Sequence, residues 1–83
     1  MGKHFHQFVE TYDGPVAFGL ARDIDEASLI VTLQKFSDDR LLEVLRSRLS
    51  EDEIRKTVDW IMALLHAHLT KEEYHRLFLR DED

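Results

Sequence analysis

The sequence contains no cysteine, one proline and three isolated glycines. Without cysteine, the chain can form neither a disulfide nor a thiolate metal site, and thiol catalysis is excluded. The glycines stand alone at Gly2, Gly14 and Gly19, so a glycine-rich phosphate-binding loop is also excluded. A small domain without such staples depends for its stability on helix packing or on self-association.

Long apolar runs and basic segments are absent as well. Runs such as Trp60 to Leu65 are far shorter than the ~20 residues that a membrane-spanning helix needs. The formal net charge of −6 disfavours nucleic acid and anionic membranes as partners. The first residues lack the apolar stretch of a signal peptide. We therefore expect a soluble, cytoplasmic protein without a nucleic-acid or membrane partner.

What the sequence does contain is a regular spacing of apolar residues over most of its 83 residues. Their recurrence every three to four residues is typical of helices that bury one side. The length and the apolar content of 43% indicate one globular domain, over residues 1–83, with a modest core. We predict an all-α fold, a compact bundle of four to five short helices. The predicted helices span residues 3–12, 24–36, 38–48, 51–68 and 71–79.

Local start signals set most of these boundaries. The segments Ser50–Glu53 and Thr70–Glu73 are capping boxes, in which a hydroxyl and a glutamate each bond a free amide at the helix start. Asp23 with Glu26 resembles an acidic version of the same box. Ser37–Asp39 places acids in a first turn, where the helix dipole favours them.

Three segments allow a second interpretation. Residues 3–12 could form a hairpin, but Pro15 has no amide proton to close the turn, so we predict a helix that ends at Gly14 and Pro15. Residues 16–22 are compatible with either a helical turn or an extended linker. Residues 29–33 are rich in β-branched side chains, yet no partner strand is evident and we predict a helix.

The helix predicted over 51–68 has an unusually wide apolar side. Its apolar residues and His68 occupy an arc of roughly 200°, whereas a surface helix needs little more than about 100°. Such a helix requires neighbours on two sides. It is either the central helix of the bundle, or part of its arc is a dimer or partner surface. The interface candidates are Trp60, Leu64, Met62 and, in the N-terminal third, Phe18.

The histidines are the only residues that suggest a metal. His66 and His68 lie about 200° apart on a helix, so they cannot chelate one ion together. The candidate ligands are therefore His4, His6, His68 and His75, with Glu72 as a carboxylate. Structural or solvent-exposed histidines are the more common case, and we expect neither a metal nor a cofactor.

Catalytic and nucleic-acid signals are weak. Ser37 and Ser50 are explained as helix caps, and the acidic pairs lie in first turns. The two helices joined near Ser50 have a helix-turn-helix spacing. However, the second begins with Glu51–Glu53, which phosphates would repel. We predict a small, acidic, non-enzymatic interaction or regulatory module that binds a protein partner or itself, most simply as a dimer. The alternative is a histidine-based transition-metal-binding domain.

Overall fold

The computed structural model describes residues 6–81, which form helices and connecting segments without a strand. The predicted all-α fold is confirmed. The described residues form two compact units, one over residues 6–48 and the other over residues 49–81. The elements are α1 (Phe8–Thr11), α2 (Arg22–Phe36), α3 (Asp39–Arg46), α4 (Glu51–His68), α5 (Lys71–Glu73) and the π-helix η1 (Tyr74–Leu79).

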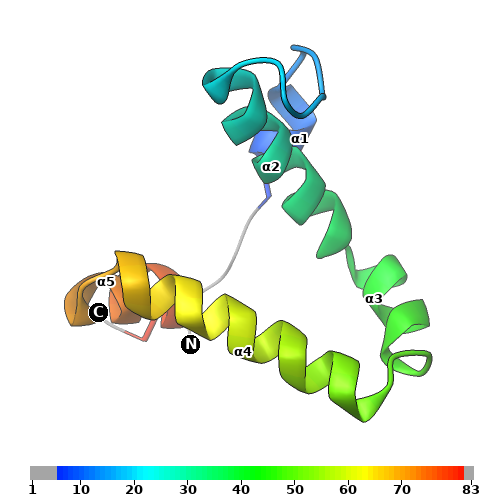
Figure 1. The fold of residues 1–83 in the computed structure, drawn as a ribbon, viewed down its shortest axis with the longest axis vertical. Coiled ribbons are helices and arrows are strands. Elements are labelled where there is room, and N and C mark those ends of the chain that lie inside the picture. Colours follow the sequence, from blue (N-terminus) through cyan, green and yellow to red (C-terminus); the bar gives the residue numbers. More distant parts are fainter. Residues whose placement is uncertain (1–5, 82–83) are drawn as a thin grey trace. The chain divides into compact units, whose positions relative to one another are not determined.

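In the N-terminal unit, the short helix α1 lies beside α2 (Figure 1). The side-chain oxygen of Gln34 on α2 accepts a hydrogen bond of 2.9 Å from the amide of Val9, and this bond ties the two helices together. Val31 and Ser28, both on α2, are 5% and 0% exposed. They are the two buried residues of the described chain, so the core of this unit is small.

The segment between α1 and α2 is not helical, so of residues 16–22, whose conformation was open, residues 16–21 connect the two helices and Arg22 begins α2. Ser28 accepts a hydrogen bond of 2.9 Å from the amide of Ala17. Asp25 accepts one of 2.8 Å from the amide of Gly19. Gly19 has a φ of +90°, a conformation that side chains disfavour. Two side chains of α2 therefore hold the connecting segment against the helix.

Two predicted helix starts in this unit are wrong. The helix predicted over 3–12 is shorter, because His6 and Gln7 precede α1 and the chain leaves the helix at Tyr12. Its residues 3–5 lie outside the described part. Helix α2 begins at Arg22 after Ala21, without the side-chain cap expected from Asp23. Glu26 instead pairs with Arg22 at 2.6 Å, one turn away.

Helix α3 begins at Asp39, one residue after the predicted start, and its cap is Asp38 rather than the predicted Ser37, which is the C-cap of α2. The carboxylate of Asp38 accepts hydrogen bonds from the amides of Arg40 and Leu41, at 3.0 and 3.1 Å. Helix α3 ends at Arg46, before the predicted end at residue 48.

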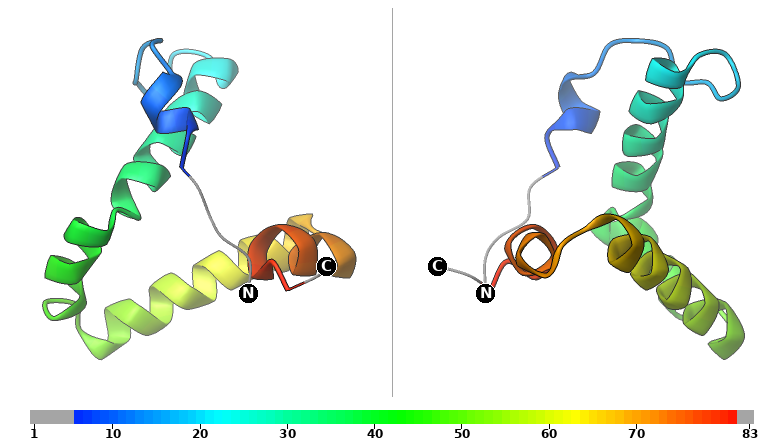
Figure 2. Two further views of the ribbon diagram at one scale, coloured as in Figure 1. Left: turned by 180° about the vertical axis from the view of Figure 1, so that it is seen from behind. Right: turned by 60° about the vertical axis from the view of Figure 1, so that its left-hand side comes forward.

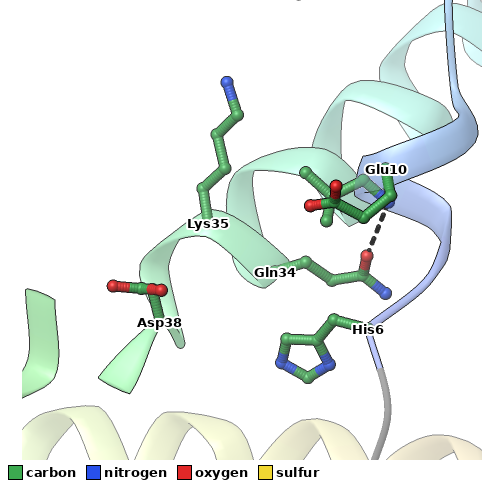
Figure 3. A pocket seen from close by; sticks show the side chains of 6 residues that line it. His6, Glu10, Gln34, Lys35 and Asp38 are labelled. Atoms are coloured by element: carbon green, nitrogen blue, oxygen red, sulfur yellow. Dashed lines mark hydrogen bonds between the residues drawn. The ribbon is translucent and has the colours of Figure 1, made fainter. Parts of the chain in front are cut away.

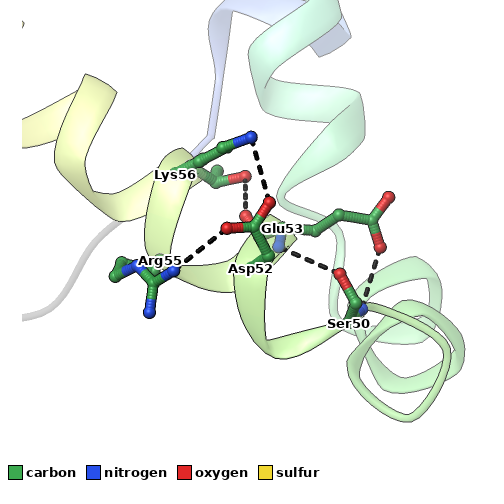
Figure 4. Close-up of polar contacts among 6 residues, drawn as sticks. Ser50, Asp52, Glu53, Arg55 and Lys56 are labelled. Carbon is green, nitrogen blue, oxygen red and sulfur yellow. Dashed lines mark hydrogen bonds and ion pairs between the residues drawn. The ribbon is translucent and has the colours of Figure 1, made fainter.

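In the C-terminal unit, α4 has the predicted bounds and the predicted capping box. The Ser50 hydroxyl accepts from the amide of Glu53 at 3.0 Å, and the Glu53 carboxylate accepts from the amide of Ser50 at 2.8 Å (Figure 4). Both amides would otherwise lack a partner inside the helix. Helix α4 runs unbroken for 18 residues.

The chain then turns at Leu69, and the C-terminal segment lies beside the last turns of α4 (Figure 2). The second capping box is confirmed, with Thr70 and Glu73 bonding each other's amides at 3.2 and 2.8 Å. These hydrogen bonds hold the pKa of Glu73 below its ordinary value. The predicted helix over 71–79 is α-helical only at α5, and continues as the π-helix η1.

Candidate interaction surface

Helix α4 packs within its own unit through its last turns, which meet the C-terminal segment. The ring of His66 stacks on Tyr74 with centroids 5.7 Å apart. Leu65 and Leu69 line a small hollow that also borders on Tyr74. Met62, Leu65 and Leu69 are partly buried. The C-terminal segment is therefore one of the two neighbours that the wide apolar arc requires.

Other large apolar residues of α4 are exposed. Trp60 is 70% exposed, and four further aliphatic side chains of the helix are between 44% and 51% exposed. Within the described chain, α4 has no buried residue. Exposed apolar side chains that adjoin one another mark interaction sites more often than isolated ones do. We call this set the α4 apolar surface; it consists of Ile54, Val58, Trp60, Ile61 and Leu64.

The α4 apolar surface is organised around a regular row. Ile54, Thr57, Ile61 and Leu64 are spaced by three, four and three residues, which places them along one line of the helix. Val58 and Trp60 lie on either flank of that line. The hydroxyl of Thr57 donates to the carbonyl oxygen of Glu53 at 2.7 Å, so it is satisfied within the helix. The row therefore presents mainly apolar atoms.

The aspartate, glutamate, lysine and arginine residues of α4 all lie in its N-terminal half. The first turn carries Glu51, Asp52 and Glu53. Asp52 pairs with Arg55 and Lys56, each at 3.0 Å, on the exposed face (Figure 4). The last turn carries two histidines and no carboxylate. The two ends of the α4 apolar surface therefore differ in charge.

The interface candidates from the sequence lie in different surroundings. Trp60 and Leu64 belong to the α4 apolar surface, and Leu64 is 48% exposed. Met62 is partly buried and lies on the same helix face as Leu65 and Leu69. Phe18 is 60% exposed in the segment before α2, in the other unit. Ile54, Val58 and Ile61 also lie in the wide apolar arc, but the sequence could not show which residues of the arc would be left exposed.

A hollow between α1 and α2 has a volume of about 420 Å³. His6, Glu10, Gln34, Lys35 and Asp38 line it with side chains of mixed charge (Figure 3). The imidazole Nε2 of His6 lies 2.6 Å from the Ser37 hydroxyl. Apart from partly buried Gln34, these labelled side chains are exposed.

The candidate metal ligands are distributed over both units. His6 lies in the N-terminal unit, whereas His68, Glu72 and His75 lie in the C-terminal unit. His75 Nδ1 lies 3.1 Å from a carboxylate oxygen of Asp81. His4 lies outside the described residues. Among residues 6–81, no three histidine or acidic side chains are grouped so that they could hold a metal ion.

Comparisons with known proteins found no relative of this chain. No family model matches the chain, and no curated protein or solved structure is significantly similar to it. In the part of the chain that the structure describes, no helix has the length and apolarity required to cross a membrane.

Proposed function

We propose that this protein is a non-enzymatic, acidic interaction module that self-associates through the α4 apolar surface. The observation that carries the proposal is the exposure of five large apolar side chains on one side of a single helix. Removing such side chains from water is the main favourable contribution to most protein association. Tryptophan is also enriched among residues that contribute strongly to interfaces.

The size of the C-terminal unit supports the same proposal. It comprises residues 49–81 of the described chain and contains no fully buried residue. Units below about 40 residues usually require disulfides, metals or oligomerisation to fold. The chain has no cysteine, and the described residues contain no metal-ligand cluster. Association with a second copy supplies the missing apolar contacts.

The proposal is tested by placing a charge inside or outside the surface. In Ile61→Asp, a carboxylate would have to be buried in the dimer, and we expect association to weaken at least about 100-fold. Ala63→Asp is the matched control, because residue 63 lies about 200° around the helix from residue 61. Sedimentation velocity at several concentrations measures both variants. Equal association of the two variants would contradict the proposal.

Trp60 provides a local readout of the same event. It is the sole tryptophan of the chain, and it lies within the α4 apolar surface. We expect its emission to move to shorter wavelength as the protein concentration rises, because association removes the indole from water. The Ile61→Asp variant should keep the emission of the dilute protein at all concentrations.

A further inference from the structure

We infer that the second copy packs on the α4 apolar surface in an antiparallel orientation, with Ile54 beside the partner's Leu64 and Thr57 beside the partner's Ile61. This inference rests on the proposed self-association and adds its geometry. It follows from the spacing of the central row, from the uneven charge of α4 and from the side that the C-terminal segment leaves free.

The spacing of the row allows a symmetric pairing. The intervals of three, four and three residues between Ile54, Thr57, Ile61 and Leu64 are the same when the helix is followed in either direction. A two-fold axis near residue 59 therefore brings each residue of the row opposite another member of the row. Such a surface is self-complementary, as a two-fold dimer requires.

The charges of α4 discriminate between the two orientations. In a parallel dimer, the first turns of both copies would lie side by side. Asp52 is paired with Arg55 and Lys56, but Glu51 and Glu53 of the two copies would repel one another. In the antiparallel dimer, each acidic turn lies beside the partner's last turn, which carries His66 and His68 and no carboxylate. The two helix dipoles are then also opposed, which is the favourable arrangement.

The flanking residues fit the antiparallel orientation as well. When two copies of a helix pack antiparallel, residues on a given flank of the central row lie beside residues on the same flank of the partner. Trp60 would therefore lie beside the partner's Trp60 on one flank, and Val58 beside the partner's Val58 on the other. These two side chains are 70% and 51% exposed. Helix α4 meets its own C-terminal segment elsewhere, through Leu65, His66 and Leu69.

Site-specific cross-linking tests the orientation, and the absence of native cysteine makes single-cysteine variants clean probes. Ile54→Cys and Leu64→Cys are mixed in equal amounts and treated with a short thiol cross-linker. One variant carries a ¹⁵N label, because the two have equal masses. We expect the mixed product to exceed either same-residue product at least about tenfold, since same-residue pairs would be separated by about 15 Å along the axis.

A second variant tests the orientation without altering the central row, where a cysteine could itself weaken the packing between the two helices. Val58→Cys lies on the flank and should cross-link to its own copy only when the helices are antiparallel. Asp59→Cys is the control, because residue 59 lies on the far side of α4 from the row, and it should give no product above background.

The outcomes separate this inference from the proposed function. Same-residue products at positions 54 and 64, with a dimeric mass, would establish a parallel dimer and overturn the orientation while supporting self-association. A single-chain mass with no product above the Asp59→Cys level would mean that another occupant covers the surface. That result would overturn both the orientation and the proposed function.

Discussion

The two units of this protein differ in how they are stabilised. The unit over residues 6–48 buries Val31 and Ser28 and ties its connecting segment to α2 through side chains. The unit over residues 49–81 has two complete capping boxes and an unbroken 18-residue helix, yet no fully buried residue. The unit with the stronger local helix signals thus has the smaller internal core.

This difference separates helix formation from burial. Caps satisfy the free amides at a helix start and contribute about 1 kcal/mol each. They do not remove the apolar side of the helix from water, which requires a neighbour. We therefore expect the N-terminal unit to be sensitive to changes in its own packing and the C-terminal unit to be sensitive to protein concentration.

The largest difference should come from the same truncation made in each unit. Val31→Ala removes two methyl groups from a buried site and should lower the free energy of unfolding by about 2 kcal/mol at every concentration. Val58→Ala truncates a half-exposed residue and should change it by less than about 0.5 kcal/mol in dilute protein. Val58→Ala should lower the free energy of unfolding further only at concentrations at which the protein associates. Urea unfolding at low and high protein concentration measures both effects. If Val58→Ala lowered the free energy of unfolding equally at all protein concentrations, the expected difference between the two units would be contradicted.

A smaller effect is expected from the hydrogen bond that holds the connecting segment. Ser28→Ala leaves the amide of Ala17 without its acceptor and should cost about 1 kcal/mol. Hydrogen exchange at that amide should become faster. Ser47→Ala is the matched control, because its hydroxyl makes only a long local contact of 3.4 Å. Equal effects of the two serine variants would mean that the bond to the segment contributes nothing to stability.

The helix caps of the C-terminal unit should contribute a comparable amount to the free energy of unfolding. Ser50→Ala removes the hydroxyl that accepts from Glu53 and should cost about 1 kcal/mol. The expected result is a lower helix content in circular dichroism at intermediate urea. Ser50→Asn should recover most of the loss, because asparagine is an equally good cap. Failure of this rescue would argue that Ser50 acts through something other than capping.

The smallest effect concerns pH. The pKa of Glu73 lies below its ordinary value of 4.5, because its carboxylate accepts a hydrogen bond from the amide of Thr70 and is further stabilised by the Thr70 side chain. The ionised form therefore stabilises the fold above that ordinary value, and the contribution is lost as the pH falls through the lower, folded-state pKa. Glu73→Gln should flatten this part of the stability profile, measured by thermal unfolding between neutral and acidic pH. An unchanged profile would remove the assigned role of the carboxylate.

The parts of the fold that were predictable from the sequence depend on neighbouring residues. Ser50 and Thr70 cap their helices through residues three positions away, and such short-range chemistry can be recognised from spacing alone. The start of α2 was missed because Asp23 and Glu26 were interpreted as a cap, whereas the acids of this turn form other local contacts. Asp25 bonds Gly19 and Glu26 pairs with Arg22, and these bonds accompany a helix start at Arg22 that has no side-chain cap.

The surface was predictable only in part, because its exposure depends on packing between separate segments of the chain. The wide arc of α4 indicated two neighbours, and Trp60 and Leu64 were named from it. Which side the C-terminal segment would cover depends on the turn at Leu69 and on the stacking of His66 with Tyr74. The π-helical geometry of η1 has no recognised signature in the residue spacing. Three-dimensional structure was required to identify Ile54, Val58 and Ile61 as exposed.

The most direct test of self-association is the molar mass of the unaltered chain as a function of concentration, measured by sedimentation equilibrium at neutral pH. We predict a mass that rises from that of one chain toward that of two chains as the concentration increases. A mass of one chain at every concentration up to the solubility limit would contradict the proposed function.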